Sequence, residues 1–135
     1  MRVRARARSE DRGDTLVEVV LITPIVFLIV FTVIQFALWY HARQIVNTAA
    51  QEGGRAARVA TTSPASAMLA GRDRAYRFIE TLGGSVVARP DVSVTRTATT
   101  VTVRVDATAL AIVPGLNLAV HGRSVSPVER FEPSS

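Results

Sequence analysis

Residues 13–39 read GDTLVEVVLITPIVFLIVFTVIQFALW, and this stretch decides the architecture of the 135-residue chain. No residue from Val19 to Trp39 carries a formal charge. As an α-helix, residues 19–39 would be roughly 31 Å long, which matches the hydrocarbon thickness of a bilayer. The apolar side chains would point in all directions, whereas the core helix of a soluble protein keeps a polar face. The segment therefore predicts a transmembrane helix.

The flanks of this segment predict its orientation. Five arginines precede it, and Trp39 and Tyr40 end it, where aromatic rings favour the headgroup region. The excess of arginine predicts a cytoplasmic N-terminus and export of everything after Tyr40. A secretory signal peptide would have a shorter apolar region with the cleavage site after it. We expect a basic cytoplasmic leader (1–13), a transmembrane helix (14–40) and one small exported domain (41–135). The leader arginines are Arg2, Arg4, Arg6, Arg8 and Arg12.

The composition restricts the chemistry of the exported part. All 16 basic residues are arginine and the formal net charge is +5, but much of that charge lies in the leader. Cleavage after Gly13 would leave 11 arginines against nine acidic residues, so we expect no nucleic-acid binding. The sequence has no cysteine, and therefore packing alone must hold the exported domain together.

Small apolar residues predict that the membrane helix continues into water. They recur at helical spacing over residues 42–60, and Ala49, Gly53 and Ala57 place a small residue at every fourth position. Such a row lets another backbone approach closely. The partner is either another subunit or an element of the same subunit, and the sequence leaves both open.

A second helix is predicted after a break at Thr61-Thr62. Ser63 is the candidate N-cap, Pro64 suits the first helical position, and Gly83-Gly84 suits the end. Its expected apolar face consists of Met68, Gly71, Ala75, Phe78, Ile79 and Leu82.

Beyond Gly84 the period of the apolar pattern changes to two, which is typical of strands with one buried face. Val92 and Val94 mark one strand, and alternating valines over residues 101–105 mark the next, with a hairpin turn near residues 97–100. Pro114-Gly115 suits the centre of a type II turn, and residues 118–128 would return as a third strand. The predicted fold class is α+β: a long membrane-spanning helix, a second helix and a small antiparallel sheet.

Three polar or helix-bending residues in the apolar segment are candidate functional residues. Glu18 is a carboxylate beside hydrocarbon, which is costly without a partner. Thr15 and Glu18 also have the spacing of a capping box, so a local cap is the alternative to a role between subunits. Pro24 should kink the helix. Gln35 would bond another helix, with snorkelling or local backbone bonding as equal alternatives.

The two histidines, His41 and His121, lie in no metal-ligand or catalytic-triad spacing. We interpret them as an interfacial ring and a surface strand residue. No enzymatic activity, metal or cofactor is predicted.

The run Gly13-Asp14-Thr15-Leu16-Val17-Glu18 between a basic leader and an apolar helix resembles the processing site of type IV prepilins. Together with Thr23-Pro24, Gln35-Phe36-Ala37 and the later Glu52-Gly53-Gly54-Arg55, it resembles the TadE-like family of Flp (tight adherence, Tad) pilus assembly proteins. The resemblance covers about 45 residues strongly. It implies a pilin-like fold and a role as a pseudopilin or minor pilin. Asp14 departs from the hydrophobic or small residue that is common after the cleaved bond.

The resemblance also implies site residues and partners. A prepilin peptidase would cut between Gly13 and Asp14, and Glu18 would then pair with the new amine of Asp14 of a neighbouring subunit. The expected partners are that peptidase, other Tad/Flp pilins and pseudopilins, the pilus assembly platform and the lipid bilayer. The alternative is an uncleaved single-pass anchor whose exported domain binds a cell-envelope partner. A membrane-anchored enzyme is a third, weaker alternative.

Overall fold

A computed structural model describes residues 7–59 and 63–128 of the chain, with side chains from Leu16 onward. The leader residues Arg2, Arg4 and Arg6, the last residue of the predicted helical extension (Ala60), the predicted break at Thr61-Thr62 and residues 129–135 lie outside these residues. The predicted α+β class is confirmed, since two helices and a three-stranded antiparallel sheet form the described part.

The first helix, α1 (Ala7–Val59), is a single continuous element that contains both the predicted membrane segment and the predicted exported extension. It runs through Pro24 without interruption, and the kink at this residue stays a prediction. The hydroxyl groups of Thr23 and Thr32 donate to the carbonyls of Val19 and Leu28 at 2.6 and 2.7 Å. These bonds satisfy the two hydroxyls inside the helix itself, which suits an apolar surrounding.

The second helix, α2 (Pro64–Gly83), begins and ends where the sequence predicts. Ser63 is the N-cap, and it forms a capping box with Ser66 at 3.1 and 3.0 Å. The predicted apolar face is partly wrong, because Leu82 is 55% exposed while Ala67 is fully buried. The side that faces α1 is a row of residues at every fourth position, namely Ala67, Gly71, Ala75, Ile79 and Gly83. Leu82 does not lie in this row, and small residues fill most of it.

The sheet consists of β1 (Val87–Arg96), β2 (Thr100–Ala109) and β3 (Ala119–Pro127), in that spatial order. Both pairings are antiparallel, with Val94 opposite Val103 and Val105 opposite Gly122. The predicted hairpin and third strand are therefore confirmed. Between β2 and β3 the amide of Leu116 donates to the carbonyl of Val113 at 3.2 Å, and Gly115 has φ +85°. This is the predicted turn, in which glycine supplies the positive φ.

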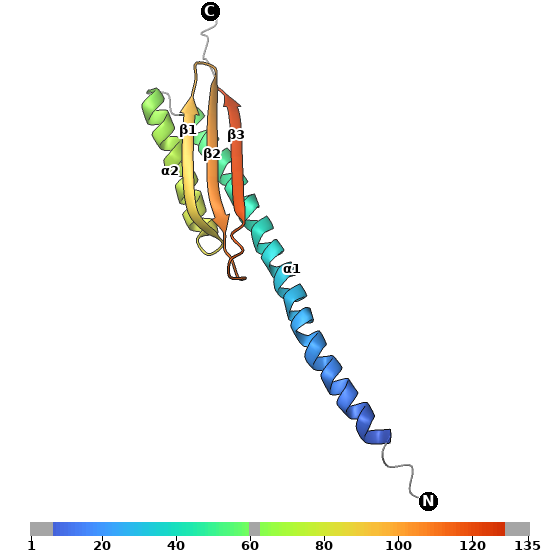
Figure 1. Cartoon of the computed structure of the whole chain (residues 1–135). Helices are drawn as coiled ribbons and strands as arrows, with labels where there is room; N and C mark the ends of the chain where they lie inside the picture. Colours follow the sequence, from blue (N-terminus) through green and yellow to red (C-terminus); the bar gives the residue numbers. More distant parts are fainter. Residues whose placement is uncertain (1–6, 60–62, 129–135) are drawn as a thin grey trace, which may run out of the picture.

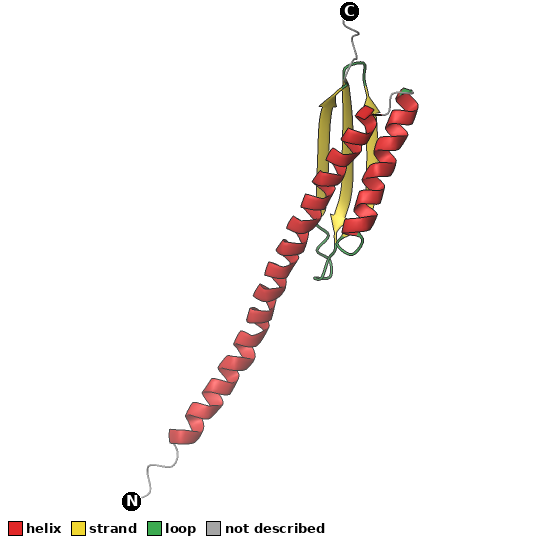
Figure 2. Ribbon diagram, turned by 180° about the vertical axis from the view of Figure 1, so that it is seen from behind, coloured by secondary structure: helices red, strands yellow, loops and turns green. Residues whose placement is uncertain are grey.

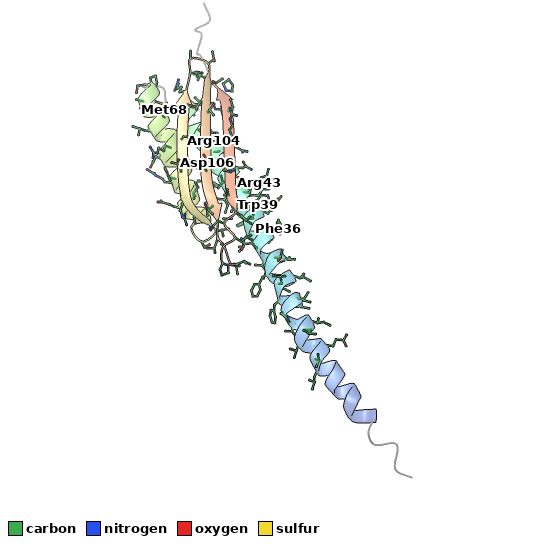
Figure 3. The ribbon with its side chains drawn as sticks, in the orientation of Figure 1. Phe36, Trp39, Arg43, Met68, Arg104 and Asp106 are labelled. Atoms are coloured by element: carbon green, nitrogen blue, oxygen red, sulfur yellow. The ribbon has the colours of Figure 1, made fainter. Side chains whose placement is uncertain are left out.

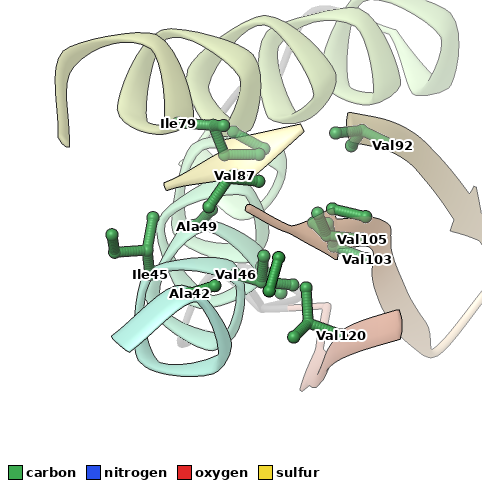
Figure 4. Packing of buried hydrophobic residues seen from close by; sticks show 14 of the residues in the cluster. Ala42, Ile45, Val46, Ala49, Ile79, Val87, Val92, Val103, Val105 and Val120 are labelled. Atoms are coloured by element: carbon green, nitrogen blue, oxygen red, sulfur yellow. The ribbon is translucent and has the colours of Figure 1, made fainter. Parts of the chain in front are cut away.

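Both helices cover the same face of the sheet (Figures 1 and 2), with α2 along β1 and α1 behind β2 and β3. The core lies between these two layers. Figure 4 shows how the valines of the three strands meet alanine and short aliphatic side chains of the helices. The fully buried residues of this core include Ala42, Val46, Ala49, Ala50, Ala57, Ala75, Val101, Val103 and Val105. The N-terminal half of α1 extends beyond this body (Figure 1).

Candidate membrane and assembly site

The side chains of α1 divide into two groups at Gln35. Every residue over 16–34 is exposed, although nearly all are apolar. This segment would be roughly 28 Å long, close to the hydrocarbon thickness of a bilayer. Among the described residues, one helix is long and apolar enough to cross a membrane, and its most apolar part is not covered by the rest of the chain. The chain thus has a single candidate membrane span in the part that the structure describes.

Gln35 is 1% exposed and is bonded to the connection between β2 and β3. Its Nε2 donates to the carbonyl of Leu110 at 3.0 Å. Its Oε1 accepts from the amide of Ile112 at 2.8 Å and from that of Val113 at 3.4 Å. The partners of Gln35 are therefore backbone groups of the same chain rather than a side chain of another helix. The α+β domain begins to contact α1 here, before the predicted boundary at Tyr40.

The next turn of α1 makes a second contact with the same end of the sheet (Figure 3). The indole Nε1 of Trp39 donates to the carbonyl of Ala119, the first residue of β3, at 3.2 Å. The guanidinium of Arg43 lies 5.6 Å from the centre of the Trp39 ring, within range of a cation–π interaction. Trp39 is thus fixed at the base of the domain, where a headgroup-level aromatic residue is expected.

The predicted row of small residues lies where α1 and α2 cross. Ala49 and Ala57 are fully buried, and Gly53 is buried as well. A Cβ atom on Gly53 would lie 2.8 Å from the carbonyl oxygen of Gly71, and one on Gly71 would lie 2.9 Å from the Cβ of Ala57. The close approach of backbones therefore occurs with α2 of the same subunit.

Glu52 connects the two helices beside this crossing. Its carboxylate accepts from Arg55 on the same helix at 3.1 Å and from Arg74 of α2 at 3.2 Å. Within the run Glu52-Gly53-Gly54-Arg55, Gly53 thus lets the two helix backbones approach, and Glu52 forms the ion pairs beside the crossing. Both arginines are exposed, so the ion pairs orient the helices more than they stabilise them.

The predicted processing residues lie within the first turns of α1. Gly13 and Asp14 are helical, and the side chain of Asp14 lies outside the described ones. Thr15 also lies well inside the helix, which begins at Ala7, so it does not cap a helix start in the full-length chain. Glu18 is exposed, and no described residue pairs with it. Its pairing with a cleaved N-terminus, like the cleavage itself, stays a prediction.

Sequence reasoning missed the role of Gly122, whose signal is visible in retrospect. Gly122 lies in β3, and a Cβ atom there would lie only 2.5 Å from the carbonyl oxygen of Val46. An isolated glycine within a strand pattern signals such a close backbone approach. Gly71, predicted on the apolar face of the second helix, is buried there and is the counterpart of Gly53 at the crossing.

The face of the sheet that the helices do not cover carries a cluster of polar side chains that the sequence pattern did not indicate. His121 is an exposed strand residue, as predicted, and its Nδ1 lies 2.6 Å from a carboxylate oxygen of Asp106. Arg104 lies 3.4 Å from the other carboxylate oxygen. Among the described residues, no three His, Cys, Asp or Glu side chains are grouped so as to hold a metal ion.

The fold and this geometry define a class: a small α+β domain carried on one long helix whose exposed half is a candidate membrane span. Residues 13–55 match the family model described as TadE-like protein. The match confirms the predicted resemblance over these residues, which extend from the predicted processing glycine to Arg55. The TadE-like family points to a function related to the Tad pilus. Neither the curated proteins nor the solved structures gave a match.

Proposed function

We propose that this protein is a minor pilin or pseudopilin that takes part in the assembly of a Tad pilus. The observation that supports it best is the extent of the family match. The matched segment includes Gly13, Glu18, the exposed apolar half of α1 and the Glu52-Gly53-Gly54-Arg55 run at the helix crossing. The leader, the membrane segment and the attachment of the exported domain thus follow one another on one helix.

The proposal includes removal of the leader by a prepilin peptidase between Gly13 and Asp14. In the full-length chain this bond lies within α1, so the peptidase would act on a helix that must open locally. Glycine lowers helix stability by about 1 kcal/mol relative to alanine, which favours opening at this position. After cleavage, Asp14 would become the first residue of the helix.

The intact mass of the protein tests this step. The chain is extracted from membranes of its native host, or of cells that coexpress the cognate prepilin peptidase. We expect a mass that begins at Asp14, and we expect Gly13→Ala to retain the leader. A wild-type mass that still begins at Met1, with the peptidase active on another substrate, would support the uncleaved single-pass anchor instead.

Glu18 is proposed to pair with the amine of Asp14 on a neighbouring subunit. Its exposure and the lack of a described partner within the chain leave its carboxylate open to such a contact. Glu18→Ala should therefore insert and be processed normally but impair pilus assembly, because a carboxylate beside hydrocarbon is costly without a partner. Electron microscopy of pili on cells that express the variant is the measurement, with Glu18→Asp as the charge-conserving control. Normal piliation by the alanine variant would remove this role.

A further inference from the structure

The connection between β2 and β3, residues 110–118, is the most apolar loop among the described residues outside α1. Between Asp106 and His121 the chain carries no charged residue. Three large side chains of the loop are exposed: Leu110 at 44%, Ile112 at 42% and Leu116 at 42%. Several exposed aliphatic side chains on one uncharged loop indicate a surface that contacts a membrane or a partner.

The loop lies at the end of the sheet nearest to the exposed half of α1, whereas the β1–β2 hairpin lies at the opposite end (Figure 1). Gln35 fixes this position, because its side chain is bonded to Leu110, Ile112 and Val113. Gln35 directly follows the last residue of the exposed apolar segment. The loop is therefore level with the end of the candidate membrane span.

The aromatic residues give the depth of the loop. Trp39 and Tyr40 follow Gln35 by four and five residues, which places them about 6 to 8 Å further along the helix. If these rings lie among the headgroups, as such residues prefer, the loop lies deeper, at the boundary with the acyl chains. Aliphatic side chains at this depth meet hydrocarbon rather than water.

Several backbone amides of the loop have partners within the protein. Irregular backbone is tolerated at membrane depth only where its polar groups find partners within the protein. Gln35 accepts from the amides of Ile112 and Val113, and the amide of Leu110 donates to the carbonyl of Val86 at 2.8 Å. The amide of Leu116 closes the turn, and Pro114 has no amide hydrogen.

We propose that the β2–β3 loop is a second membrane contact, in which Leu110, Ile112 and Leu116 enter the bilayer leaflet from which α1 emerges. Together with α1 it would fix the tilt of the exported domain against the membrane surface. The exposed side chains of the loop contact lipid, because the loop lies at the same depth as the end of the apolar segment of α1. This inference rests on α1 as a membrane span and does not depend on leader processing or on a pilus role.

Depth-dependent fluorescence quenching tests the proposal on the full-length chain. The sequence has no cysteine, so Ile112→Cys, Leu116→Cys and the control Ala98→Cys each give one labelling site. Ala98 is exposed in the β1–β2 hairpin at the far end of the sheet. Each variant carries an environment-sensitive fluorophore and is reconstituted in vesicles of phosphatidylcholine and phosphatidylglycerol. Nitroxides on the acyl chains report contact with lipid, and iodide reports contact with water.

We expect labels at residues 112 and 116 to have blue-shifted emission, strong nitroxide quenching and little iodide quenching, with the reverse at residue 98. Iodide quenching at residues 112 and 116 equal to that at residue 98 would overturn the proposal. Protection from both quenchers, lost on dilution with empty lipid, would also overturn it and identify a second subunit as the cover. Two labelling sites guard against a local effect of one label, and circular dichroism verifies the fold of each variant.

Discussion

The two halves of α1, before and after Gln35, have opposite surroundings. Over residues 16–34 the side chains are large, aliphatic or aromatic, and exposed on every side. Beyond Gln35 the buried side chains are mainly alanine, glycine, valine and isoleucine, and they lie on one side of the helix against α2 and the sheet. The size of the apolar side chains and their distribution around the helix, rather than apolar character alone, therefore distinguish a lipid-facing helix from one that packs within a domain. Small residues let the backbones of two elements approach closely, whereas large side chains keep neighbouring backbones apart.

A charge introduced at equivalent residues of the two halves should have the largest effect. Val46 is fully buried, and Val46→Asp should destabilise the exported domain by about 3 to 5 kcal/mol, because it leaves a buried charge without a partner. Val26 is 51% exposed, so Val26→Asp should leave domain stability unchanged and instead disfavour membrane insertion by about 2.5 to 3.5 kcal/mol.

Pulse proteolysis of both full-length variants in detergent measures domain stability, and alkaline carbonate extraction measures insertion. Equal loss of domain stability in the two variants would contradict the division of α1 at Gln35.

Two glycines at the contact between α1 and β3 should respond with opposite signs. Gly122→Ala places a Cβ atom 2.5 Å from a backbone carbonyl, and we expect a loss of about 1 to 3 kcal/mol. For Gly54→Ala, the nearest atom to the new Cβ atom would be the hydroxyl oxygen of Ser124 at 3.0 Å, which can rotate away. This change should be neutral or stabilising by up to about 1 kcal/mol, because alanine favours the helix.

Thermal unfolding of the two variants followed by circular dichroism is the measurement. Similar melting temperatures for both would show that β3 adjusts to a Cβ atom at residue 122, and the close approach would not be required.

The most local effect is expected at the boundary between the halves. Gln35→Leu removes the bonds that hold the β2–β3 loop, so local opening should become easier by roughly 1 to 3 kcal/mol. Thr32→Val is the matched control, since its hydroxyl bonds only the helix carbonyl of Leu28.

Hydrogen exchange of the Ile112 and Val113 amides distinguishes the two variants. Protection that survives Gln35→Leu would mean that packing, and not this side chain, holds the loop against α1.

The elements of the fold were predictable because each has a local signal. Ser63-Pro64 and Gly83-Gly84 mark the ends of α2 by their capping preferences, and alternating valines mark the strands. The apolar face of α2 was less predictable. Leu82 was expected on the apolar face because of its helical spacing, yet the residues buried against α1 form the row that contains Ala67.

The candidate site was predictable only in part. The sequence identified the row Ala49, Gly53 and Ala57 but left its partner open between another subunit and the same chain. The structure assigns it to α2 of the same chain through Gly71, a residue whose role depends on how two helices cross. Gln35 was identified as an unusual polar residue in an apolar segment, but its partners follow it by about 75 residues.

The sequence by itself determined the order and type of the elements, the candidate membrane span and the family resemblance, because periodicity, charge and capping act over a few neighbouring residues. Only the tertiary structure decided which side of each helix is buried, where the membrane segment gives way to the domain, and what Gln35 and Gly122 contact. These features depend on groups that are distant in the chain and adjacent in space. A pattern of neighbouring residues does not indicate which distant groups will be in contact.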